Sequence, residues 1–525
     1  MTCKRKLTPM RPLLILLTLL LAAPALRAQM HIPHNRAEDT DHVMGEAYWA
    51  QWNDTLQAGI DAAIERNRKA DTVVAIPGIR KGTTVHVEQL GHAFFFGAHI
   101  FNYNQLGSAD ANARYRELFG TLFNSATVAF YWKTFEDRPG RLRFATEYWD
   151  TEDYWNGLDD PKHQFHWRRP ASDQAVDWCL GRGVRVHGHP LIWGNRRWHH
   201  PDWIQDQFLT GRERETWNRM MTGRRLQGGT QDEFSPKYRQ ISNRELSDSL
   251  PQFARQLRKA FRDRIVRIAQ HYGDRIKSWD VVNESTADYE AGCFREEAPL
   301  CRSTYGIMPG EYVRDAFRTA DSLFGPEVKL NLNDYKTGRS YADWTDELLR
   351  QGCRIDVLGS QMHLFKPQQC LDLAAGKTGG GLPTPVYEKE VMERLSRLGR
   401  PIHLSEITIT APGDDDRGRM IQAILARNLY RLWFSIERME GITWWNVVDD
   451  CGAPGEPSVS GLFFRNMEPK PAYHALRELI DEEWKTRLDV RADRQGKVSF
   501  RGFRGRYRLT WKDGKGQEQS LEMDL

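Results

Sequence analysis

The sequence predicts a (β/α)8 barrel with a small accessory β-domain formed by the two ends of the chain. Three observations support this fold class. Short apolar segments recur through the middle of the chain, and amphipathic helical segments lie between several of them, as in parallel strands joined by helical crossovers. Eight such apolar segments can be distinguished. Strands with Gly-rich or Pro-Gly turns lie before and after this region, where an antiparallel sheet is expected.

Residues 1–28 are expected to be a secretory signal peptide. Residues 1–12 are basic, and an apolar run of 11 residues from Leu13 to Ala23 follows. This run is too short to cross a bilayer, and the small residues after it fit cleavage behind Ala25 or Ala28. The mature protein is therefore expected to be secreted or periplasmic.

Net charge indicates which partners to expect. The chain has 74 Lys and Arg against 70 Asp and Glu, a net charge of +4. Residues 1–28 hold five of the basic residues and no acidic ones, so 69 basic and 70 acidic residues remain, a net charge of −1. A nearly neutral chain lacks the basic surface that nucleic acids or anionic membranes require. We expect neither as a partner of the mature protein, and we expect a monomer.

Residues 29–90 and 481–525 are expected to form the accessory β-domain. A helical lead-in spans about 30–70, strands are expected at 72–76 and 83–88, and two more at 497–500 and 507–511. Each pair alone is too small for a stable sheet, so we expect the pairs to join in a small β-sandwich. It is either a carbohydrate-binding module or a structural cap, and the absence of an evident exposed aromatic row favours the cap.

Residues 91–480 are expected to form the barrel. One helix is predicted by apolar residues from Leu250 to Ile268 at steps of three or four, and it ends near Gly273. A second carries Val391 and Leu395 and ends at Gly399. The region is long for this fold, and the clearest insertion is 140–170. The expected strands are Phe94–Ala98, Ser125–Tyr131, Val184–Ile192, Ile276–Val282, Val328–Leu332, Ile355–Gln361, Pro401–Ser405 and Ile442–Val447.

Two carboxylates follow two of these strands. Asn283-Glu284 ends the fourth strand and Ser405-Glu406 ends the seventh. Active sites of such barrels lie at the carboxyl ends of the strands, so both side chains should face the central mouth. Two carboxyl groups in unlike environments suit the cleavage of a glycosidic bond, in which one acts as a proton donor and the other stays ionised.

The other strand ends carry amides, imidazoles and indoles. Such groups bind sugar hydroxyls and stack on sugar rings, so their number at one face favours a neutral carbohydrate substrate. They include His187, His189, Trp193, Asn331, Asn333, Tyr335, Gln361, His363, Trp444, Trp445 and Asn446.

These motifs together resemble glycoside hydrolase family 10, the family of the retaining endo-β-1,4-xylanases. The similar segments are Gly188–Trp193, Trp279–Glu284, Asn333–Tyr335, Gly359–His363 and Glu406, in the same order along roughly 94–480, and Pro469–Tyr473 is similar to the family's closing helix. The resemblance implies a hydrolase acting on plant-type polysaccharide, with xylan as the default substrate. We expect no metal or cofactor.

The resemblance also implies residue roles. Glu284 corresponds to the general acid/base, and Glu406 corresponds to the nucleophile. Asn283 would bond the sugar 2-hydroxyl, and His363 would hydrogen-bond Glu406. Tyr335 would lie toward the leaving group. The site of the cleaved sugar would be lined by His189, Trp193, Gln361 and Trp445.

Several positions depart from the family pattern. The usual Glu-Asn-x-Met-Lys-Trp motif of the second strand is replaced by Thr127–Trp132, so Thr127, Val128 and Tyr131 stand where Glu, Asn and Lys grip the upstream sugars. Gly194, Thr408 and Asn446 replace the usual His, Asp and Gly. We therefore expect weak activity on plain linear xylan and better activity on a decorated, short or differently linked β-glycoside, unless the insertion restores the missing contacts.

Two other functions are weighed against this one. His187, His189 and His363 could ligate a metal in a metal-dependent hydrolase, but HxH usually lies on the first strand of such barrels, and the paired glutamates would have no task. A non-catalytic sugar-binding barrel would be expected to lack one of the two carboxylates, yet both are present.

Six cysteines remain after the signal segment, and an even number in an exported chain permits disulfides. Cys293 and Cys301 are the best pair by proximity. None of the six has the spacing of a zinc site.

Overall fold

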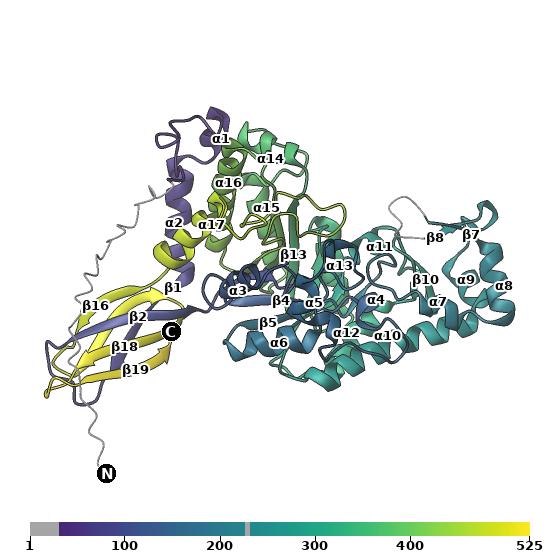
Figure 1. Cartoon of the computed structure of the whole chain (residues 1–525), viewed down its shortest axis with the longest axis horizontal. Coiled ribbons are helices and arrows are strands. Elements are labelled where there is room, and N and C mark those ends of the chain that lie inside the picture. Colours follow the sequence, from purple (N-terminus) through teal and green to yellow (C-terminus); the bar gives the residue numbers. More distant parts are fainter. Residues whose placement is uncertain (1–30, 226–231) are drawn as a thin grey trace, which may run out of the picture. The chain divides into compact units, whose positions relative to one another are not determined.

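The central element of the computed structural model is a closed barrel of eight parallel strands (Figure 1). Neighbouring strands follow the chain order, and pairing of β15 with β3 and of β9 with β12 closes the ring. All eight expected strands are present, and the predicted fold class is confirmed. The strands are β3 Phe95–His99, β4 Ser125–Ala129, β5 Arg185–His189, β9 Ser278–Asn283, β12 Lys329–Asp334, β13 Val357–Leu364, β14 Ile402–Ile409 and β15 Met439–Trp444.

The structure describes residues 31–225 and 232–525. The expected signal peptide, residues 1–28, therefore lies outside the described residues. Within the described part, no helix is long and apolar enough to cross a membrane.

Helices follow the barrel strands. The longest, α10, buries Phe253, Leu257, Phe261 and Ile265 on one face and ends at Gly273, whose φ of 52° suits glycine. The helices that connect successive strands are α3 Ala109–Glu117, α6 Ser172–Gly181, α10 Pro251–Tyr272, α12 Tyr312–Leu323, α13 Arg339–Arg350, α15 Pro385–Ser396 and α16 Asp416–Ser435, and α17 Pro471–Arg477 follows the last strand.

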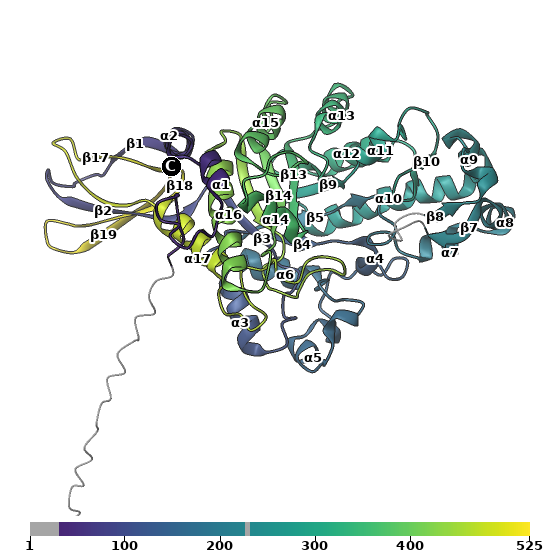
Figure 2. The same cartoon turned by 90° about the horizontal axis from the view of Figure 1, so that it is seen from above.

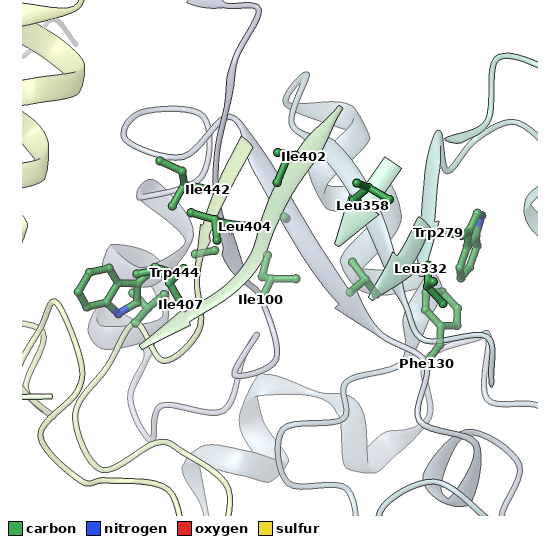
Figure 3. Packing of buried hydrophobic residues seen from close by; sticks show 14 of the residues in the cluster. Ile100, Phe130, Trp279, Leu332, Leu358, Ile402, Leu404, Ile407, Ile442 and Trp444 are labelled. Atoms are coloured by element: carbon green, nitrogen blue, oxygen red, sulfur yellow. The ribbon is translucent and has the colours of Figure 1, made fainter. Parts of the chain in front are cut away.

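The barrel strands separate an apolar outer layer from a polar interior. Leu332, Leu358, Leu404 and Ile442, from four neighbouring strands, belong to the main buried cluster (Figure 3). The residues that alternate with these along each strand are polar and form hydrogen bonds between strands. His403 Nε2, for example, lies 2.8 Å from the Thr443 hydroxyl oxygen. Since successive side chains of a strand point to opposite faces, this pattern aligns the polar residues toward the mouth.

The two ends of the chain meet in the accessory sheets, as expected. Strand β1 (Lys69–Ala75) pairs with β17 (Lys497–Phe503) (Figure 2). In the second sheet, β2 (Thr84–His92) lies between β16 (Arg487–Arg491) and β18 (Gly505–Lys512), with β19 (Glu518–Asp524) at the edge (Figure 1). Both sheets contribute to one separate hydrophobic core formed by Ile76, Val85, Val87, Ala492, Val498, Phe500, Tyr507 and Leu509.

The accessory strands are preceded by two helices and joined to the barrel by aromatic packing. Helices α1 (Glu46–Gln51) and α2 (Asp54–Arg68) form the expected helical lead-in. Trp484 stacks on Phe434 of α16, with ring centroids 4.1 Å apart, and Phe503 of β17 lies in the barrel's own cluster. The large hydrophobic side chains exposed on the described accessory strands are Val73 and Leu521, neither of them aromatic.

Two insertions lie beside the barrel. The expected one, 140–170, folds into α5 (Glu152–Asn156) and short helical turns around a buried ion pair between Arg143 and Asp150 (2.6 Å). A second insertion, not predicted, separates β5 from α10. It contains β6 Ile192–Trp193, α7 Trp203–Phe208, α8 Gly211–Met220, β7 Met221–Arg225, β8 Asp232–Phe234 and α9 Asn243–Ser249.

Smaller elements complete the described chain. They are α4 Trp132–Phe135, α11 Thr286–Glu290, β10 Leu300–Arg302, β11 Ile307–Pro309, α14 Pro367–Ala374, the 3-10 helices η1 Tyr148–Asp150, η2 Pro161–His163 and η3 Pro236–Tyr238, and the π-helix η4 Glu478–Glu483.

Cys293 and Cys301, the best candidate pair for a disulfide by proximity, are not bonded to each other. All six cysteines of the described residues are buried thiols. Cys293 and Cys301 do lie together, but their thiols face backbone carbonyls: Cys293 Sγ lies 3.1 Å from the Arg302 oxygen, and Cys301 Sγ lies 3.5 Å from the Cys293 oxygen. Their proximity in the sequence predicted that the two side chains lie together, but both remain thiols.

Candidate active site

A cavity of about 800 Å³ opens at the carboxyl ends of the barrel strands. All nine residues proposed from the sequence line it, so the fold brings together side chains from six of the strands or the segments that follow them. They are His189, Trp193, Asn283, Glu284, Tyr335, Gln361, His363, Glu406 and Trp445.

Glu284 follows the last residue of β9 and is held in a strained backbone conformation. Its φ is 57°, and its N–H donates to the Asn333 carbonyl oxygen at 2.7 Å. A left-handed conformation is costly for a residue other than glycine, and such strain is found preferentially at functional sites. The carboxylate accepts hydrogen bonds from Trp193 Nε1 (3.1 Å) and Gln361 Nε2 (3.3 Å).

The environment of Glu284 favours its protonated form. Burial raises its pKa to about 8, and the nearby carboxylates of Glu406 and Asp334 add to the rise. The hydrogen bonds from Gln361 and Trp193 oppose the shift but do not cancel it. A carboxyl group that keeps its proton near neutral pH can serve as a general acid.

Glu406 lies in an environment of hydrogen-bond donors. It is inside β14, because this strand continues to Ile409 instead of ending at Ser405 as predicted. Its Oε1 accepts from Asn333 Nδ2 at 2.8 Å, and the imidazoles of His189 and His363 approach its two oxygens at 3.8 and 3.6 Å. The Asn333 hydrogen bond therefore fixes the position of this carboxyl group.

Asn333 connects the two halves of the site. It is fully buried on β12, and its amide donates to both Glu406 and Asn283 Oδ1, the latter at 2.9 Å. The Ser405 hydroxyl donates to its Oδ1, which fixes the orientation of the amide. Gln361 Nε2 donates to the same Asn283 oxygen at 3.2 Å. These bonds link β9, β12, β13 and β14 at the level of the two carboxyl groups.

The histidines are held in a way that does not suit a metal site. Asp280 Oδ2 lies 2.9 Å from His187 Nε2 and 2.7 Å from His189 Nδ1. Burial alone would raise the pKa of Asp280, but the two histidines lower it. His187, His189 and His363 do not converge on one point. Among residues 31–225 and 232–525, the group whose ligand atoms do converge is His34, Glu478 and Glu483, none of which lines the cavity.

Comparison with known proteins agrees with this geometry. Residues 110–479 match the model of glycosyl hydrolase family 10, which is more than half of the chain. The chain belongs to this family. It is therefore a xylanase-like glycoside hydrolase, as the strand-end motifs implied.

The relatives found in the comparison include several that are named endo-1,4-beta-xylanase. The chain is 26% identical over 345 residues to endo-1,4-beta-xylanase B of Thermotoga neapolitana, covering 63% of this chain and 80% of that one. It is 28% identical over 236 residues to endo-1,4-beta-xylanase B of Neocallimastix patriciarum, covering 43% of this chain and a quarter (25%) of that relative's length. Among solved structures, xylanase 10B of Thermotoga petrophila in complex with xylobiose aligns with a TM-score of 0.49 at 21% identity, covering 74% of this chain and 95% of that one.

One departure from the family pattern lies beside the candidate nucleophile. Thr408 stands where an Asp is usual, and its hydroxyl lies 2.9 Å from His363 Nδ1. Because a neutral hydroxyl can donate to this nitrogen, His363 can carry its proton on Nε2, the atom that faces Glu406. The hydroxyl therefore maintains the orientation of the imidazole without an added charge.

The largest departure from the family pattern is in the motif of the second strand, which the resemblance assigns to the sugars upstream of the cleaved bond. Tyr131, in place of the usual Lys, lines the cavity, and the guanidinium of Arg169 lies 3.7 Å from its ring centroid. Arg169 comes from the end of the 140–170 insertion. Its neighbour Arg168 contacts Glu456 (3.3 Å) and Asn446 Oδ1 (3.0 Å). The insertion therefore brings two cations next to this wall.

Sequence reasoning missed several residues at this site. Glu456 lines the cavity from the segment after β15 and accepts from Trp445 Nε1 at 3.3 Å, and no pattern in the sequence indicated it. Asn333 is named from the sequence among the polar strand-end residues, and Asp280 lies within the motif of the fourth strand, but neither is assigned a role beside the two glutamates there.

Proposed function

We propose that this protein hydrolyses β-glycosidic bonds with retention of configuration, by double displacement with two glutamates. Glu284 acts as general acid and then as general base, and Glu406 acts as the nucleophile. The observation that carries this assignment is the contrast between the two environments. Burial and nearby carboxylates favour the protonated form of Glu284, whereas Glu406 accepts a hydrogen bond from Asn333 and has the imidazoles of His189 and His363 close to its two oxygens.

The other cavity residues suit the binding of the cleaved sugar. Asn283 is positioned to bond the 2-hydroxyl, because Asn333 and Gln361 both donate to its oxygen and leave its amide hydrogens available. Among the remaining lining residues, Tyr335 is 44% exposed, which suits a role at the leaving-group side. The walls of the sugar site are His189, Trp193, Gln361, His363 and Trp445.

The polysaccharide we propose as substrate is β-1,4-linked xylan, cleaved internally. Relatives named endo-1,4-beta-xylanase support this proposal. A second candidate is a decorated or differently linked β-glycoside, and the upstream wall favours it. Tyr131 and Val128 cannot replace the charge and amide that grip an unsubstituted chain, and a site that lacks those groups discriminates weakly.

Single substitutions of the two glutamates test the mechanism. Glu284→Ala should nearly abolish hydrolysis of xylan but retain much more activity on aryl β-xylobiosides with good leaving groups, because these need no proton from the enzyme. Glu406→Ala should abolish both. Glu390→Ala, at an exposed position of α15, is the matched control and should behave as the wild type.

Proton NMR of the first-formed product provides the second test. Retention predicts that the β-anomer forms first and then mutarotates. An α-anomer formed first, or equal losses in the two glutamate variants on the activated substrate, would contradict the assignment. Complete inactivity of the wild type on every β-glycan, together with sugar binding, would instead support a non-catalytic sugar-binding barrel.

We also propose that the protein is exported and works as a monomer. The basic segment, apolar run and small residues of positions 1–28 support export. Processing can be tested by N-terminal sequencing of protein recovered from the culture medium or periplasm. Light scattering of the purified protein tests its oligomeric state.

A further inference from the structure

Gly194 stands where the family usually has a His, and the proposed function gives this departure no task. The residue is buried directly after Trp193. A β-carbon added at Gly194 would lie 3.6 Å from the Ser303 hydroxyl oxygen and 3.6 Å from Cδ2 of Tyr305, which are ordinary contact distances. A β-carbon therefore fits, but the larger imidazole of a His would compete with the ring of Tyr305 for space.

Tyr305 lies at the tip of the hairpin formed by β10 and β11, and this tip is firmly held. The buried carboxyl group of Asp288, on α11, accepts from the Ser303 hydroxyl and from the Thr304 N–H, each at 2.6 Å. The Tyr305 N–H in turn donates to the Ser303 oxygen at 3.1 Å. The position of Tyr305 is therefore fixed by bonds to the helix that follows Glu284.

The hydroxyl of Tyr305 reaches the catalytic cavity through Tyr335. The two phenol oxygens are 3.1 Å apart, and in the described part of the chain Tyr305 is the hydrogen-bond partner of the Tyr335 side chain. Tyr335 lines the cavity and is 44% exposed, whereas Tyr305 is partly buried. Burial raises the pKa of Tyr305, and the charge of Glu284 adds to the rise. Its hydroxyl therefore keeps its proton at neutral and mildly alkaline pH and can donate it to Tyr335.

We propose that Tyr305 is a positioning residue for the sugar on the leaving-group side of the cleaved bond, and that it acts by fixing the ring of Tyr335. This proposal rests on the proposed function, which places Tyr335 on that side. A ring that is held in one rotamer before a sugar arrives loses less conformational entropy on binding than a free one. The absence of a side chain at position 194 leaves the room that Tyr305 needs for this contact.

The leaving-group side is used twice in a retaining reaction. In the first half it holds the departing sugar. In the second half, a sugar bound there can replace water as the acceptor: its hydroxyl gives a proton to Glu284, its oxygen bonds to the anomeric carbon, and the ester bond to Glu406 breaks. At a fixed acceptor concentration, the ratio of transfer to hydrolysis therefore reports how well this side binds a sugar. A general loss of folded or active enzyme does not change that ratio.

The test uses 2,4-dinitrophenyl β-xylobioside as the donor and xylobiose as the added acceptor. Tyr305→Phe removes only the hydroxyl and should lower the ratio of transfer to hydrolysis roughly 2- to 10-fold, the effect of one neutral hydrogen bond. It should lower kcat/KM on xylotetraose, whose leaving group is a sugar, by a similar factor. Hydrolysis of the donor without acceptor should stay within twofold. Tyr238→Phe, at a partly buried tyrosine of η3 outside the cavity, is the matched control.

A second set of variants tests the link to Gly194. Gly194→Ala adds a β-carbon at ordinary contact distance and should keep the wild-type transfer ratio. Gly194→His should displace the ring of Tyr305 and lower the ratio as far as Tyr305→Phe does. The double variant Gly194→His/Tyr305→Phe should be no worse than Gly194→His alone, because the same hydrogen bond is lost in both.

The proposal is overturned if Tyr305→Phe keeps both the wild-type transfer ratio and the wild-type kcat/KM on xylotetraose, or if it lowers hydrolysis of the donor by as much as these. Failure of the proposed function gives a different result, namely a wild type that releases no dinitrophenol and leaves xylotetraose intact. In that case calorimetry with xylotetraose decides. Binding weakened at least twofold in Tyr305→Phe but not in Tyr238→Phe supports the positioning role, and equal binding by the wild type and Tyr305→Phe refutes it.

Discussion

Removal of the Asn333 side chain should weaken catalysis by a predictable amount. The amide of Asn333 donates to Glu406 at 2.8 Å and to Asn283 at 2.9 Å, and all three groups are buried. Asn333→Ala therefore deletes one hydrogen bond to a group that we propose is ionised, and also the link that orients Asn283. It leaves both proposed catalytic residues, Glu284 and Glu406, unsubstituted.

The magnitude follows from the kind of bond that is lost. A hydrogen bond to a charged group contributes about 1.5–3 kcal/mol. Because each 1.36 kcal/mol of transition-state stabilisation is a factor of ten in rate, Asn333→Ala should lower kcat/KM roughly 10- to 150-fold. Asn333→Asp keeps the shape but places a second carboxylate next to Glu406. Two carboxyl groups at this distance cannot both ionise readily, so one takes up a proton.

The assay is kcat/KM on an aryl β-xylobioside between pH 4 and 9. Asn333→Asp should lose more activity than Asn333→Ala at neutral pH, and the acidic limb of its pH profile should move to higher pH, since the nucleophile must be deprotonated. Circular dichroism and Tm establish that both variants fold. The reasoning is refuted if Asn333→Ala stays within twofold of the wild type, or if Asn333→Asp is no worse than Asn333→Ala.

Three further outcomes are expected. First, kcat/KM should be retained below pH 8 and fall as pH rises through about 8, because Glu284, whose pKa burial raises to about 8, is then losing its catalytic proton; a profile flat to pH 10 contradicts this. Second, Thr408→Val should lower kcat/KM roughly 2- to 10-fold through loss of the bond to His363. Its matched control is Thr410→Val, since the buried Thr410 hydroxyl has no hydrogen-bond partner in the described chain. Third, truncation after Lys485 removes both strand partners of β2 and should lower Tm by several degrees, and unchanged calorimetric unfolding would show that the accessory sheets do not stabilise the barrel.

The barrel could be predicted from sequence because its strands are short apolar runs with clear limits. The seventh strand shows where this reasoning fails. Its end is predicted at Ser405 because the alternation of Ile402 and Leu404 stops there. A register shift between Leu404 and Ile407 returns Ile407 and Ile409 to the apolar face, so β14 extends past the candidate nucleophile. The insertion between β5 and α10 was missed because it is polar and lacks a regular hydrophobic period. Such segments are fixed by contacts with the barrel that no local pattern reveals.

The candidate site was predictable where its residues lie at strand ends and not elsewhere. The barrel geometry alone places such residues at a common mouth, and all nine proposed residues do line the cavity. Glu456 comes from the segment after β15, and Tyr387 and Glu388 come from a helix that packs outside the barrel. Their place at the cavity depends on tertiary packing, so their sequence positions carried no signal.

Two of the departures from the family pattern, at positions 131 and 446, are linked in the structure by Arg168 and Arg169. Tyr131 replaces a Lys on the second strand, and Asn446 replaces a Gly after the eighth, and in the sequence they look unrelated. In the structure, Asn446 Oδ1 accepts from Arg168, and the adjacent Arg169 stacks on Tyr131. Arg168 has a left-handed φ of 60°, which directs the two consecutive side chains to these different partners.

This coupling changes what an upstream sugar would meet. In place of a carboxylate, an amide and an ammonium that hydrogen-bond directly, the wall presents the ring of Tyr131, backed by the guanidinium of Arg169. Glu456 compensates the charge of Arg168 and lines the cavity as well. Because the members of such a network share partners, substitutions at Tyr131, Arg169 and Asn446 should not act additively. Contacts with a sugar at this wall would therefore depend on the insertion and the barrel together. Restoring the family residue at position 131 alone would leave Arg169 without its stacking partner and place two cations side by side.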